Sequence, residues 1–298
     1  MSKNKKLIVI AGTTASGKSA LGIALAKKFG GEIISADSRQ IYRGLKIGSG
    51  AVSKKEVSDI PHYLLSVANP KKTFTVSQYK KLARKKMEEI WKRNKLPIIV
   101  GGTGLYIRAA VDGLVIPEVK PNPKLRRELE KKSVSELSLI LKKKDVRRWR
   151  EIDKKNPRRL VRAIEIATAL GKVPAIKMNP LAAEVLFIGI RKEGKMLESL
   201  VKKRVAKMVR EGLVAETKKL AKTGVSERKI REFGFEYSNT LAFIDGEIGS
   251  KSELIDKIVK STLDYAKRQM TWFGKDSRII WIRNRQEAII KINKFLIL

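Results

Sequence analysis

The sequence predicts an α/β fold, in which a parallel sheet is flanked by helices and interrupted by an all-helical insertion domain. Three observations support this prediction: apolar, β-branched runs that end in glycine, the alternation of such runs with helical segments, and a change of composition after Gly113. Continuous apolar runs are typical of parallel strands, because helices cover both faces of a parallel sheet. Their alternation with helical segments indicates strand–helix–strand units.

The first part of the chain, residues 1–113, contains three of the predicted strands. Apolar runs place them at Leu7–Ala11, Glu32–Ala36 and Pro97–Val100. Helical periodicity predicts helices over Ala20–Phe29 and from about Ser77 to Asn94.

The next part, residues 114–184, is predicted to be the helical insertion. Prolines punctuate the connection into it, and from Pro123 to about Ala183 the sequence is lysine-rich and nearly without strand signals. Strand character returns at Val185–Ile190 and at Arg278–Ile282. We therefore expect residues 185–298 to complete one core with residues 1–113.

Between these last two strands the sequence predicts helices. One carries an apolar stripe with Arg204 at its edge, formed by Leu197, Leu200, Val201, Val205 and Met208. Another runs from Ser252 to about Phe273.

Charge is the strongest compositional signal. The chain has 66 Lys and Arg against 30 Asp and Glu, a formal net charge of +36. A field of this size opposes compaction and indicates a polyanionic partner. The alternative is a surface of solvated lysines in an organism whose proteins are generally basic.

The chain has no cysteine, which excludes disulfides and Cys-ligated zinc and fits a reducing cytoplasm. The apolar run at Leu7–Ala11 is too short for a signal peptide or a membrane span. We expect a cytoplasmic protein without a membrane segment, and a monomer, since nothing indicates an obligate partner.

The most specific motif lies between the first strand and the first helix and matches G-x-x-x-x-G-K-[ST]. It consists of Gly12, Thr13, Thr14, Ala15, Ser16, Gly17, Lys18 and Ser19. In such a loop the backbone N–H groups converge on phosphate oxygens, Lys18 supplies a cation and Ser19 can hold Mg²⁺. The motif predicts a core like that of the P-loop NTPases, with a site for a diphosphate or triphosphate. The alternative is a plain glycine turn.

Two further strand ends carry polar residues. The third strand continues into Gly101-Gly102-Thr103-Gly104, without the strand-end Asp that positions magnesium in ordinary P-loop NTPases. Thr103 therefore suits a phosphate or a base better than a metal. Asp37 follows the second strand, where it can accept a proton from a nucleophile or cap a helix.

Five motifs, in order over nearly the whole chain, resemble the tRNA dimethylallyltransferases, the isopentenyl-tRNA transferase family. They are residues 12–19, Asp37 to Leu45, GGTGLYI at 101–107, NPRRLVRAIE at 156–165 and AKRQMTW at 266–272.

This resemblance implies transfer of the dimethylallyl group of dimethylallyl diphosphate to N6 of adenosine 37 in tRNA, with Mg²⁺. It implies that Asp37 is the base, that Arg204 is directed at the diphosphate, that Thr14 belongs to the catalytic group, and that residues 12–19 hold the diphosphate. By periodicity alone, Arg204 reads as a solvated helix charge.

The resemblance also implies contacts with tRNA, whose target base must leave its stack to be reached. The implied contacts are Ser35, Ala36, Asp37, Ser38, Arg39, Gln40, Thr103, Arg126, Arg158, Arg159, Leu160, Val161, Arg162, Lys267, Arg268 and Gln269. The insertion adds basic residues with an aromatic between them at Lys142–Lys144, Arg147–Arg150 and Lys154–Lys155, which fit a grip on the anticodon stem-loop. Taken singly, each lysine run reads more simply as a solvated face.

Several features limit or oppose this interpretation. Thr13 stands where the family usually has proline, and residues 191–195 match its pattern loosely, so the register before Arg204 is less firm. One alternative is an adenylate prenyltransferase or a P-loop kinase acting on a small nucleotide. Another is an RNA-binding protein that retains an inactive fold.

Overall fold

The structure is a computed structural model that describes residues 5–52, 57 and 59–297. The chain divides into two compact units: a core unit that comprises the residues up to Gly113 and those from Pro180 onward, and an insertion unit, Leu114–Asn179. None of the helices in the described residues is long and apolar enough to cross a membrane.

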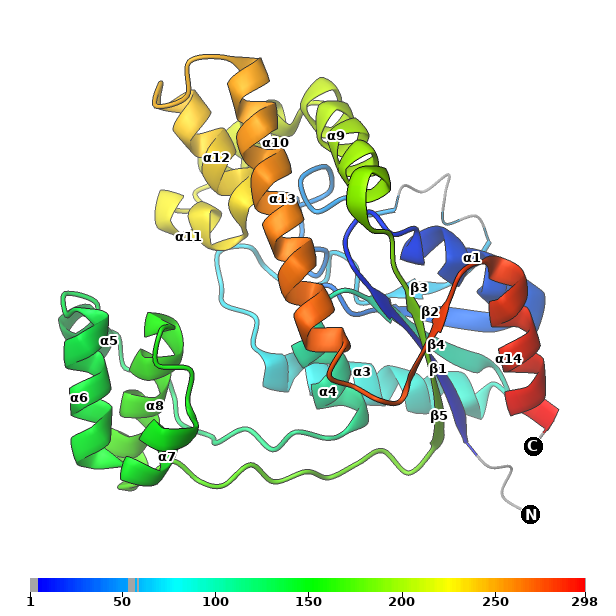
Figure 1. The fold of residues 1–298 in the computed structure, drawn as a ribbon, viewed down its shortest axis with the longest axis horizontal. Helices are drawn as coiled ribbons and strands as arrows, with labels where there is room; N and C mark the ends of the chain where they lie inside the picture. The colour runs from blue at the N-terminus through cyan, green and yellow to red at the C-terminus, as the bar shows by residue number, and fades with distance from the viewer. Residues whose placement is uncertain (1–4, 53–56, 58, 298) are drawn as a thin grey trace. The chain divides into compact units, whose positions relative to one another are not determined.

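The core unit is built on a six-stranded sheet in the order β3-β2-β4-β1-β5-β6 (Figure 1). All neighbouring strands pair in parallel, which confirms the predicted sheet. The strands are β1 (Lys6–Gly12), β2 (Gly31–Ser35), β3 (His62–Tyr63), β4 (Leu96–Gly101), β5 (Glu184–Ile190) and β6 (Ile279–Ile282). The two-residue edge strand β3 carries no sequence signal and was not predicted.

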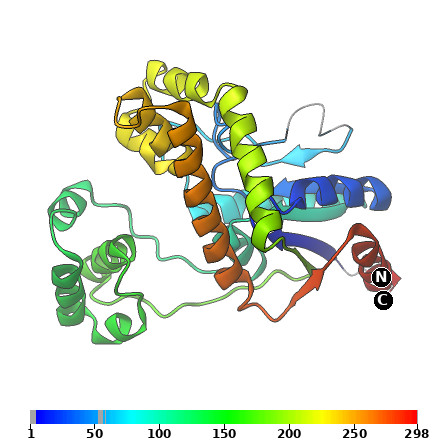
Figure 2. The same cartoon turned by 45° about the horizontal axis from the view of Figure 1, so that its top comes forward.

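Alternate residues of β1 face two different hydrophobic clusters, because successive side chains of a strand point to opposite faces. Ile8 and Ile10 pack with α1 (Lys18–Phe29) and α14 (Arg285–Ile297). Leu7 and Val9 belong to the larger cluster on the other face. That cluster includes residues of α3 (Val76–Lys92), α4 (Gly104–Val111) and α13 (Lys251–Phe273) (Figure 2). The strands are therefore covered on both faces, as their continuous apolar runs require.

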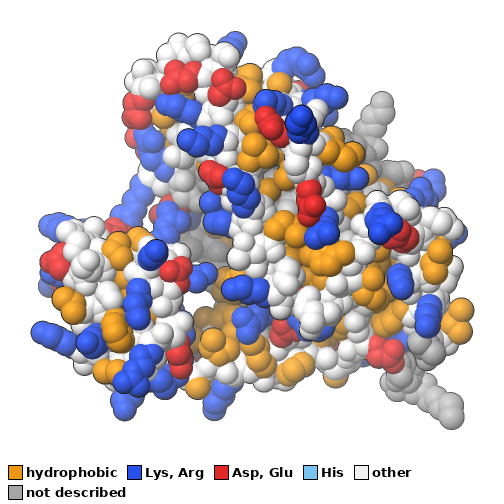
Figure 3. All heavy atoms as spheres, in the orientation of Figure 1, with side chains coloured by type: hydrophobic (Ala, Val, Ile, Leu, Met, Phe, Trp, Pro, Cys, Tyr) orange, Lys and Arg blue, Asp and Glu red, His pale blue; other side chains and the backbone are white. Residues whose placement is uncertain are grey.

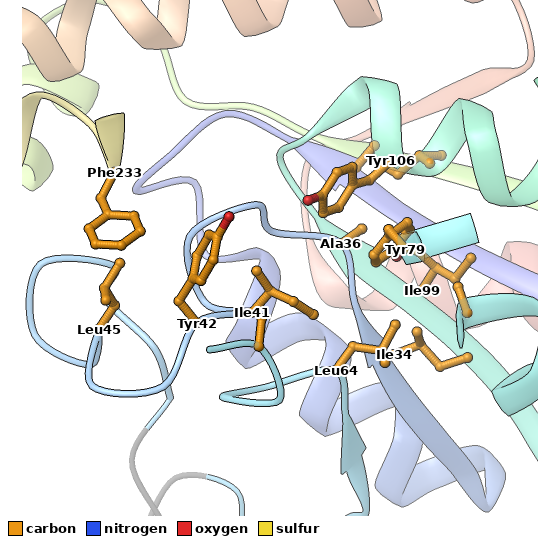
Figure 4. Close-up of a cluster of buried hydrophobic side chains, with 14 of the residues drawn as sticks. Ile34, Ala36, Ile41, Tyr42, Leu45, Leu64, Tyr79, Ile99, Tyr106 and Phe233 are labelled. Carbon is orange, nitrogen blue, oxygen red and sulfur yellow. The ribbon is translucent and has the colours of Figure 1, made fainter. Parts of the chain in front are cut away.

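The larger cluster extends from the sheet to the loop that follows β2 (Figure 4). Tyr79 and Tyr106 stack beside the sheet with ring centroids 4.0 Å apart. Farther along, the Tyr42 ring packs against Phe233 at 4.9 Å. Ile41 and Leu45 of the same loop are fully buried. The loop after β2 is therefore held by side chains in the core, which gives a fixed backbone to the polar residues that it carries.

Four helices precede α13 in the second half of the core unit. They are α9 (Gly194–Arg210), α10 (Leu213–Lys222), α11 (Glu227–Glu232) and α12 (Phe235–Ile244). On α9 the predicted apolar stripe is buried at Val201, Val205 and Met208.

The insertion unit contains four helices: α5 (Pro123–Leu129), α6 (Val134–Lys144), α7 (Val146–Glu151) and α8 (Pro157–Leu170). They enclose a core of their own around Leu137, Leu141, Leu160 and Ile164. On the visible face of this unit, Lys and Arg side chains outnumber Asp and Glu (Figure 3). This unit is therefore a small helical bundle with a basic surface.

Two expectations about the end of the insertion are wrong. The helical pattern does not continue to Ala183, because α8 ends at Leu170, where Gly171 takes a φ of 77° and Pro174 follows. The boundary also lies before residue 184. The backbone N–H of Leu181 donates to the Val111 carbonyl at 2.8 Å and that of Glu184 to the Lys5 carbonyl at 2.8 Å, so these residues belong to the core unit.

Candidate active site

A polar cavity lies in the core unit at the carboxyl ends of β1, β2 and β4. These strands are neighbours in the sheet, and the carboxyl ends of parallel strands meet at one edge. Helices α9, α12 and α13 supply the remaining wall. The lining residues are Thr14, Lys18, Ser19, Asp37, Ser38, Arg39, Gln40, Ser49, Gly50, Val100, Gly101, Gly102, Arg204, Glu236, Tyr265 and Gln269.

The loop from Gly12 to Ser19 has the form of a phosphate cradle. Ala15 and Gly17 adopt positive φ angles of 57° and 92°, and α1 begins at Lys18 without a capping bond from the Gly17 position. The Ser16 hydroxyl and the Lys18 ammonium both donate to the Thr13 carbonyl, at 2.8 and 2.5 Å. The helix N-terminus and the cation therefore both favour an anion at the same place.

Lys18 is electrostatically unusual. Burial, and next the positive charge of Arg204, lower its pKa to about 8, although Asp37 acts in the opposite direction. Burial also lowers the pKa of Arg204, against the effects of Glu236 and Asp37. Desolvation disfavours the charged form of each side chain. A bound anion between them would therefore offset part of this free-energy cost.

Asp37 is fixed by the loop that follows β2. Its Oδ1 accepts hydrogen bonds from the backbone N–H groups of Arg39 at 2.8 Å and Gln40 at 3.2 Å. Asp37 therefore caps a turn, while the helix considered from the sequence does not follow. The Thr103 hydroxyl accepts from the Ser38 N–H at 3.1 Å, so the loops after β2 and β4 are joined by this hydrogen bond.

Arg39 is held within the protein. Its guanidinium forms an ion pair with Glu236 and lies over the rings of Phe235 and Tyr265, at 4.6 and 5.4 Å from their centroids. Burial is the largest single influence and lowers the pKa of Arg39, but Glu236, Asp37, Tyr265 and Tyr237 together outweigh it and the net shift is upward. Glu236 and Tyr265 line the cavity but were missed from the sequence, because 197 residues separate Glu236 from Arg39 and no local pattern joins them.

Gln269 links two loops of the site. Its Oε1 accepts from the Thr14 N–H at 2.8 Å, and its Nε2 donates to the Gly102 carbonyl at 2.8 Å. A Cβ on Gly102 would lie 2.3 Å from that Nε2, so glycine is required for the approach. The side chain is 6% exposed, whereas Lys267 and Arg268 are exposed. Lys267, Arg268 and Gln269 were all expected to contact tRNA. The side-chain amide of Gln269 instead bonds Thr14 and Gly102 inside the protein.

Arg204 reaches the cavity from α9. Its Nη2 donates to the Ser49 carbonyl at 3.4 Å. A Cβ on Gly50, which has a φ of 57°, would lie 2.0 Å from the same nitrogen. The residue lines the cavity together with Lys18 and Asp37, so it is not a solvated charge at the edge of a helix.

The predicted contact residues of the insertion unit fall into three groups. Arg126 and Arg162 both bond the carboxylate of Glu165, at 2.8 and 2.5 Å. Leu160 and Val161 are 0% and 8% exposed and belong to the insertion core, so their side chains are not available at the surface. Arg158 and Arg159 are exposed.

The aromatic residue among the insertion's basic residues contacts lysines of the same unit. The Trp149 ring lies under two ammonium groups, that of Lys142 at 4.9 Å and that of Lys154 at 4.0 Å. Its Nε1 donates to the Ser138 hydroxyl at 2.8 Å. In this arrangement the Trp149 ring and its N–H group both contact side chains of the insertion unit itself.

A divalent ion in the cavity would have few protein ligands. The described residues contain no group of three or more His, Cys, Asp or Glu side chains that could hold a metal. Ser19 and Asp37 do line the cavity. Mg²⁺ usually keeps several waters and binds through one or two side chains plus substrate phosphates, so this donor set fits an ion carried in with a diphosphate.

Comparisons with known proteins agree with this geometry. The model of the IPP transferase family matches residues 40–276. The chain is 37% identical to the tRNA dimethylallyltransferase of Carboxydothermus hydrogenoformans, over 99% of this chain and 97% of that protein. It is also 37% identical to the tRNA dimethylallyltransferase of Acetivibrio thermocellus, over 97% and 96%.

Solved structures agree as well. The tRNA isopentenylpyrophosphate transferase of Bacillus halodurans has a TM-score of 0.72 at 32% identity, covering 98% of this chain and 95% of that one. A eukaryotic dimethylallyltransferase acting on tRNA has a TM-score of 0.81 at 25% identity, covering 98% and 79%. With a family match over most of its length and relatives of this identity, the chain belongs to the IPP transferase family.

Proposed function

We propose that this chain transfers the dimethylallyl group of dimethylallyl diphosphate to N6 of adenosine 37 in tRNA, giving N6-dimethylallyladenosine. The observation that carries the proposal is a single cavity that holds a phosphate loop, two desolvated cations and a carboxylate. Lys18, Arg204 and Asp37 all line it, and they come from three separate elements. Membership of a family whose members are named tRNA dimethylallyltransferases supports the acceptor and the donor.

The donor end of the reaction uses the loop from Gly12 to Ser19. As the N6 nitrogen attacks C1 of the dimethylallyl group, the bond from C1 to the diphosphate oxygen breaks and its electron pair leaves on that oxygen. Lys18 and Arg204 would stabilise the negative charge that develops there. Bound Mg²⁺, held by Ser19 and the diphosphate, would supply further charge neutralisation.

The acceptor end uses Asp37. The amine loses a proton as its bond to carbon forms, and the Asp37 carboxylate, which follows β2, would take it. The Thr103 hydroxyl is tied to the Ser38 N–H, which fixes the loop that presents Asp37. Gln269 joins the phosphate loop to Gly102, so the donor and acceptor loops keep a set spacing.

The insertion unit would hold the RNA. Its exposed Arg158 and Arg159, with the lysines of α6, provide cations for phosphate contacts. We place this activity in the cytoplasm, which fits a chain without cysteine, and we propose that the enzyme acts as a monomer.

The test is acceptor choice. The protein is incubated with labelled dimethylallyl diphosphate, Mg²⁺ and either an anticodon stem-loop with an adenosine at position 37 or free AMP. We expect label in the stem-loop and none in AMP. Labelling of AMP alone would replace the proposal with an adenylate prenyltransferase. A kinase is less compatible with the site, since β4 ends in Val100 and Gly101 without a carboxylate.

A further inference from the structure

We infer that Glu216, on α10 and outside the cavity, is a positioning residue that orients Arg204 through the loop Lys46–Gly50. The inference rests on the proposed function, because it assigns Arg204 to the diphosphate. Glu216 is absent from the cavity lining, so its effect must pass through other residues.

The Glu216 carboxylate organises one turn of this loop. Its Oε2 accepts from the backbone N–H groups of Lys46 and Ile47, both at 2.9 Å. Its Oε1 accepts from the Gly48 N–H at 3.0 Å and from the Tyr237 hydroxyl at 2.8 Å. Three successive N–H groups that converge on one carboxylate form the concave arrangement by which backbones bind anions, filled here by a side chain of the same protein.

The same loop carries the groups that contact Arg204. The Ser49 carbonyl, which accepts from Arg204 Nη2 at 3.4 Å, directly follows the last N–H bound by Glu216. Gly50 comes next, and the space left by its missing side chain is occupied by the guanidinium. Gln40 also donates to the carbonyls of Ser49 and Gly50, at 3.5 and 3.3 Å. The loop thus fixes both the acceptor and the space for Arg204.

Both oxygens of the carboxylate are needed for this arrangement. Each accepts two hydrogen bonds, and a carboxylate is an acceptor at both oxygens. In Glu216→Gln one oxygen becomes an NH₂ group, which would face either two backbone N–H groups or one N–H and a hydroxyl. The loop would then move, and the position of Arg204 would change with it.

The first experiment compares donor and RNA kinetics. For Glu216→Gln we expect kcat/KM for dimethylallyl diphosphate to fall by about tenfold to a hundredfold, as for a catalytic group displaced by about 1 Å. Affinity for inorganic diphosphate, measured by calorimetry, should fall as well, while affinity for the stem-loop should stay within about twofold of wild type. Glu211→Gln, the same change at an exposed residue near the end of α9, should leave all three unchanged.

The second experiment tests whether the effect passes through Arg204. In a double-mutant cycle on inorganic diphosphate binding, Glu216→Gln should cost little once Arg204→Ala is present, because residues that act through one contact are not additive. Equal loss in both backgrounds, no loss in the single variant, or an equal loss of RNA affinity would overturn the inference.

Two controls keep the outcomes separate. Glu216→Asp retains the charge but shortens the reach, so it should show the same selective loss of donor binding even where Glu216→Gln is too unstable to purify. If the wild-type protein neither binds diphosphate nor transfers the prenyl group, the proposed function itself is wrong. If the wild-type protein does both and Glu216→Gln binds and reacts equally well, only the role of Glu216 is wrong.

Discussion

The cations of the core cavity and those of the insertion unit are held in different ways. In the cavity, Lys18 has a pKa lowered to about 8 by burial, and Arg39 is ion-paired to Glu236 between two aromatic rings. In the insertion, Arg158 and Arg159 are exposed. A diphosphate in a transition state needs charge at fixed points, whereas an RNA backbone is bound by many weaker contacts that salt screens.

This difference predicts which single substitutions should change the reaction rate and which should change RNA affinity. In the proposed mechanism Lys18, Arg204 and Asp37 contact atoms that react or leave, so the loss of any one of them should change the rate strongly. Each basic side chain of the insertion unit would contribute one of many phosphate contacts. Its loss should therefore lower RNA affinity only slightly and should reduce the dependence of that affinity on salt. Five predictions test this division and the electrostatics behind it, from the largest expected effect to the smallest.

Asp37→Asn should have the largest effect. Its amide oxygen can still accept from the N–H groups of Arg39 and Gln40, so the turn is kept while the proton acceptor is lost. We expect prenyl transfer to fall by roughly a hundredfold or more, as expected for loss of a general base. Binding of the stem-loop, followed by filter retention, should be unchanged. Undiminished turnover would remove Asp37 from the mechanism.

Lys18 should make diphosphate binding depend on pH. In the free protein its pKa is about 8, so the ammonium is lost as pH rises through 8, and affinity for inorganic diphosphate should fall roughly tenfold or more between pH 7 and 9.5. Lys18→Met should bind diphosphate more weakly at pH 7. It should also lack the fall in affinity that the wild-type protein shows as Lys18 loses its proton. Parallel profiles for the two proteins would contradict the assignment.

The same shift has a consequence for stability. The pKa of Lys18 is lower in the folded protein than its ordinary value of 10.5, so between pH 8 and 10.5 the unfolded chain binds more protons. The contribution of Lys18 to the free energy of unfolding should therefore increase with pH across this window and be absent from Lys18→Met. Urea unfolding of both proteins at pH 7.5 and 10 measures it.

Glu165→Gln should have an intermediate effect in the insertion. Its carboxylate side chain is 1% exposed and bonds Arg126, Arg162 and the Asn122 N–H. Loss of charge there should lower the free energy of unfolding by about 1–3 kcal/mol, as for a buried group left with poor partners. RNA affinity should fall several-fold as both arginines lose their orientation. Glu128→Gln, at an exposed position of α5, is the control, and equal effects in the two variants would contradict a special role for Glu165.

Lys143→Ala should have the smallest effect. Lys143 is exposed on α6, and removal of one phosphate contact should reduce the slope of log affinity against log salt by at most about one. Affinity of the stem-loop at moderate salt should change less than about threefold, and transfer at saturating RNA should not change. A large loss of kcat would contradict the assignment of catalysis to the core unit and of RNA binding to the insertion unit.

Much of the fold could be predicted because the relevant signals are local. The apolar run at Leu7–Ala11 lies within β1, and the predicted helix Ser252–Phe273 differs from α13 by one residue at its start. The phosphate loop was found because its function requires a fixed spacing of glycines, Lys18 and Ser19. These features depend on neighbours in the sequence.

The rest could not be predicted because it depends on contacts between distant residues. Nothing near Glu236 indicates that it will meet Arg39, and nothing near Glu216 indicates that it will bind the N–H groups of residues 46–48. The motif around Gln269 predicts a contact with RNA, whereas its side-chain amide bonds Thr14 and Gly102 inside the protein. The position of Leu160 and Val161 in a motif likewise predicts RNA contacts, whereas helical packing buries both side chains.

The most direct test of the central claim is mass spectrometry of tRNA nucleosides from cells that contain or lack this gene. The account predicts N6-dimethylallyladenosine at position 37 in cells with the wild-type gene, its loss on deletion, and its return with wild type but not with Asp37→Asn. Persistence of the modification in the deletion, in a cell with no second enzyme of this family, would contradict the account.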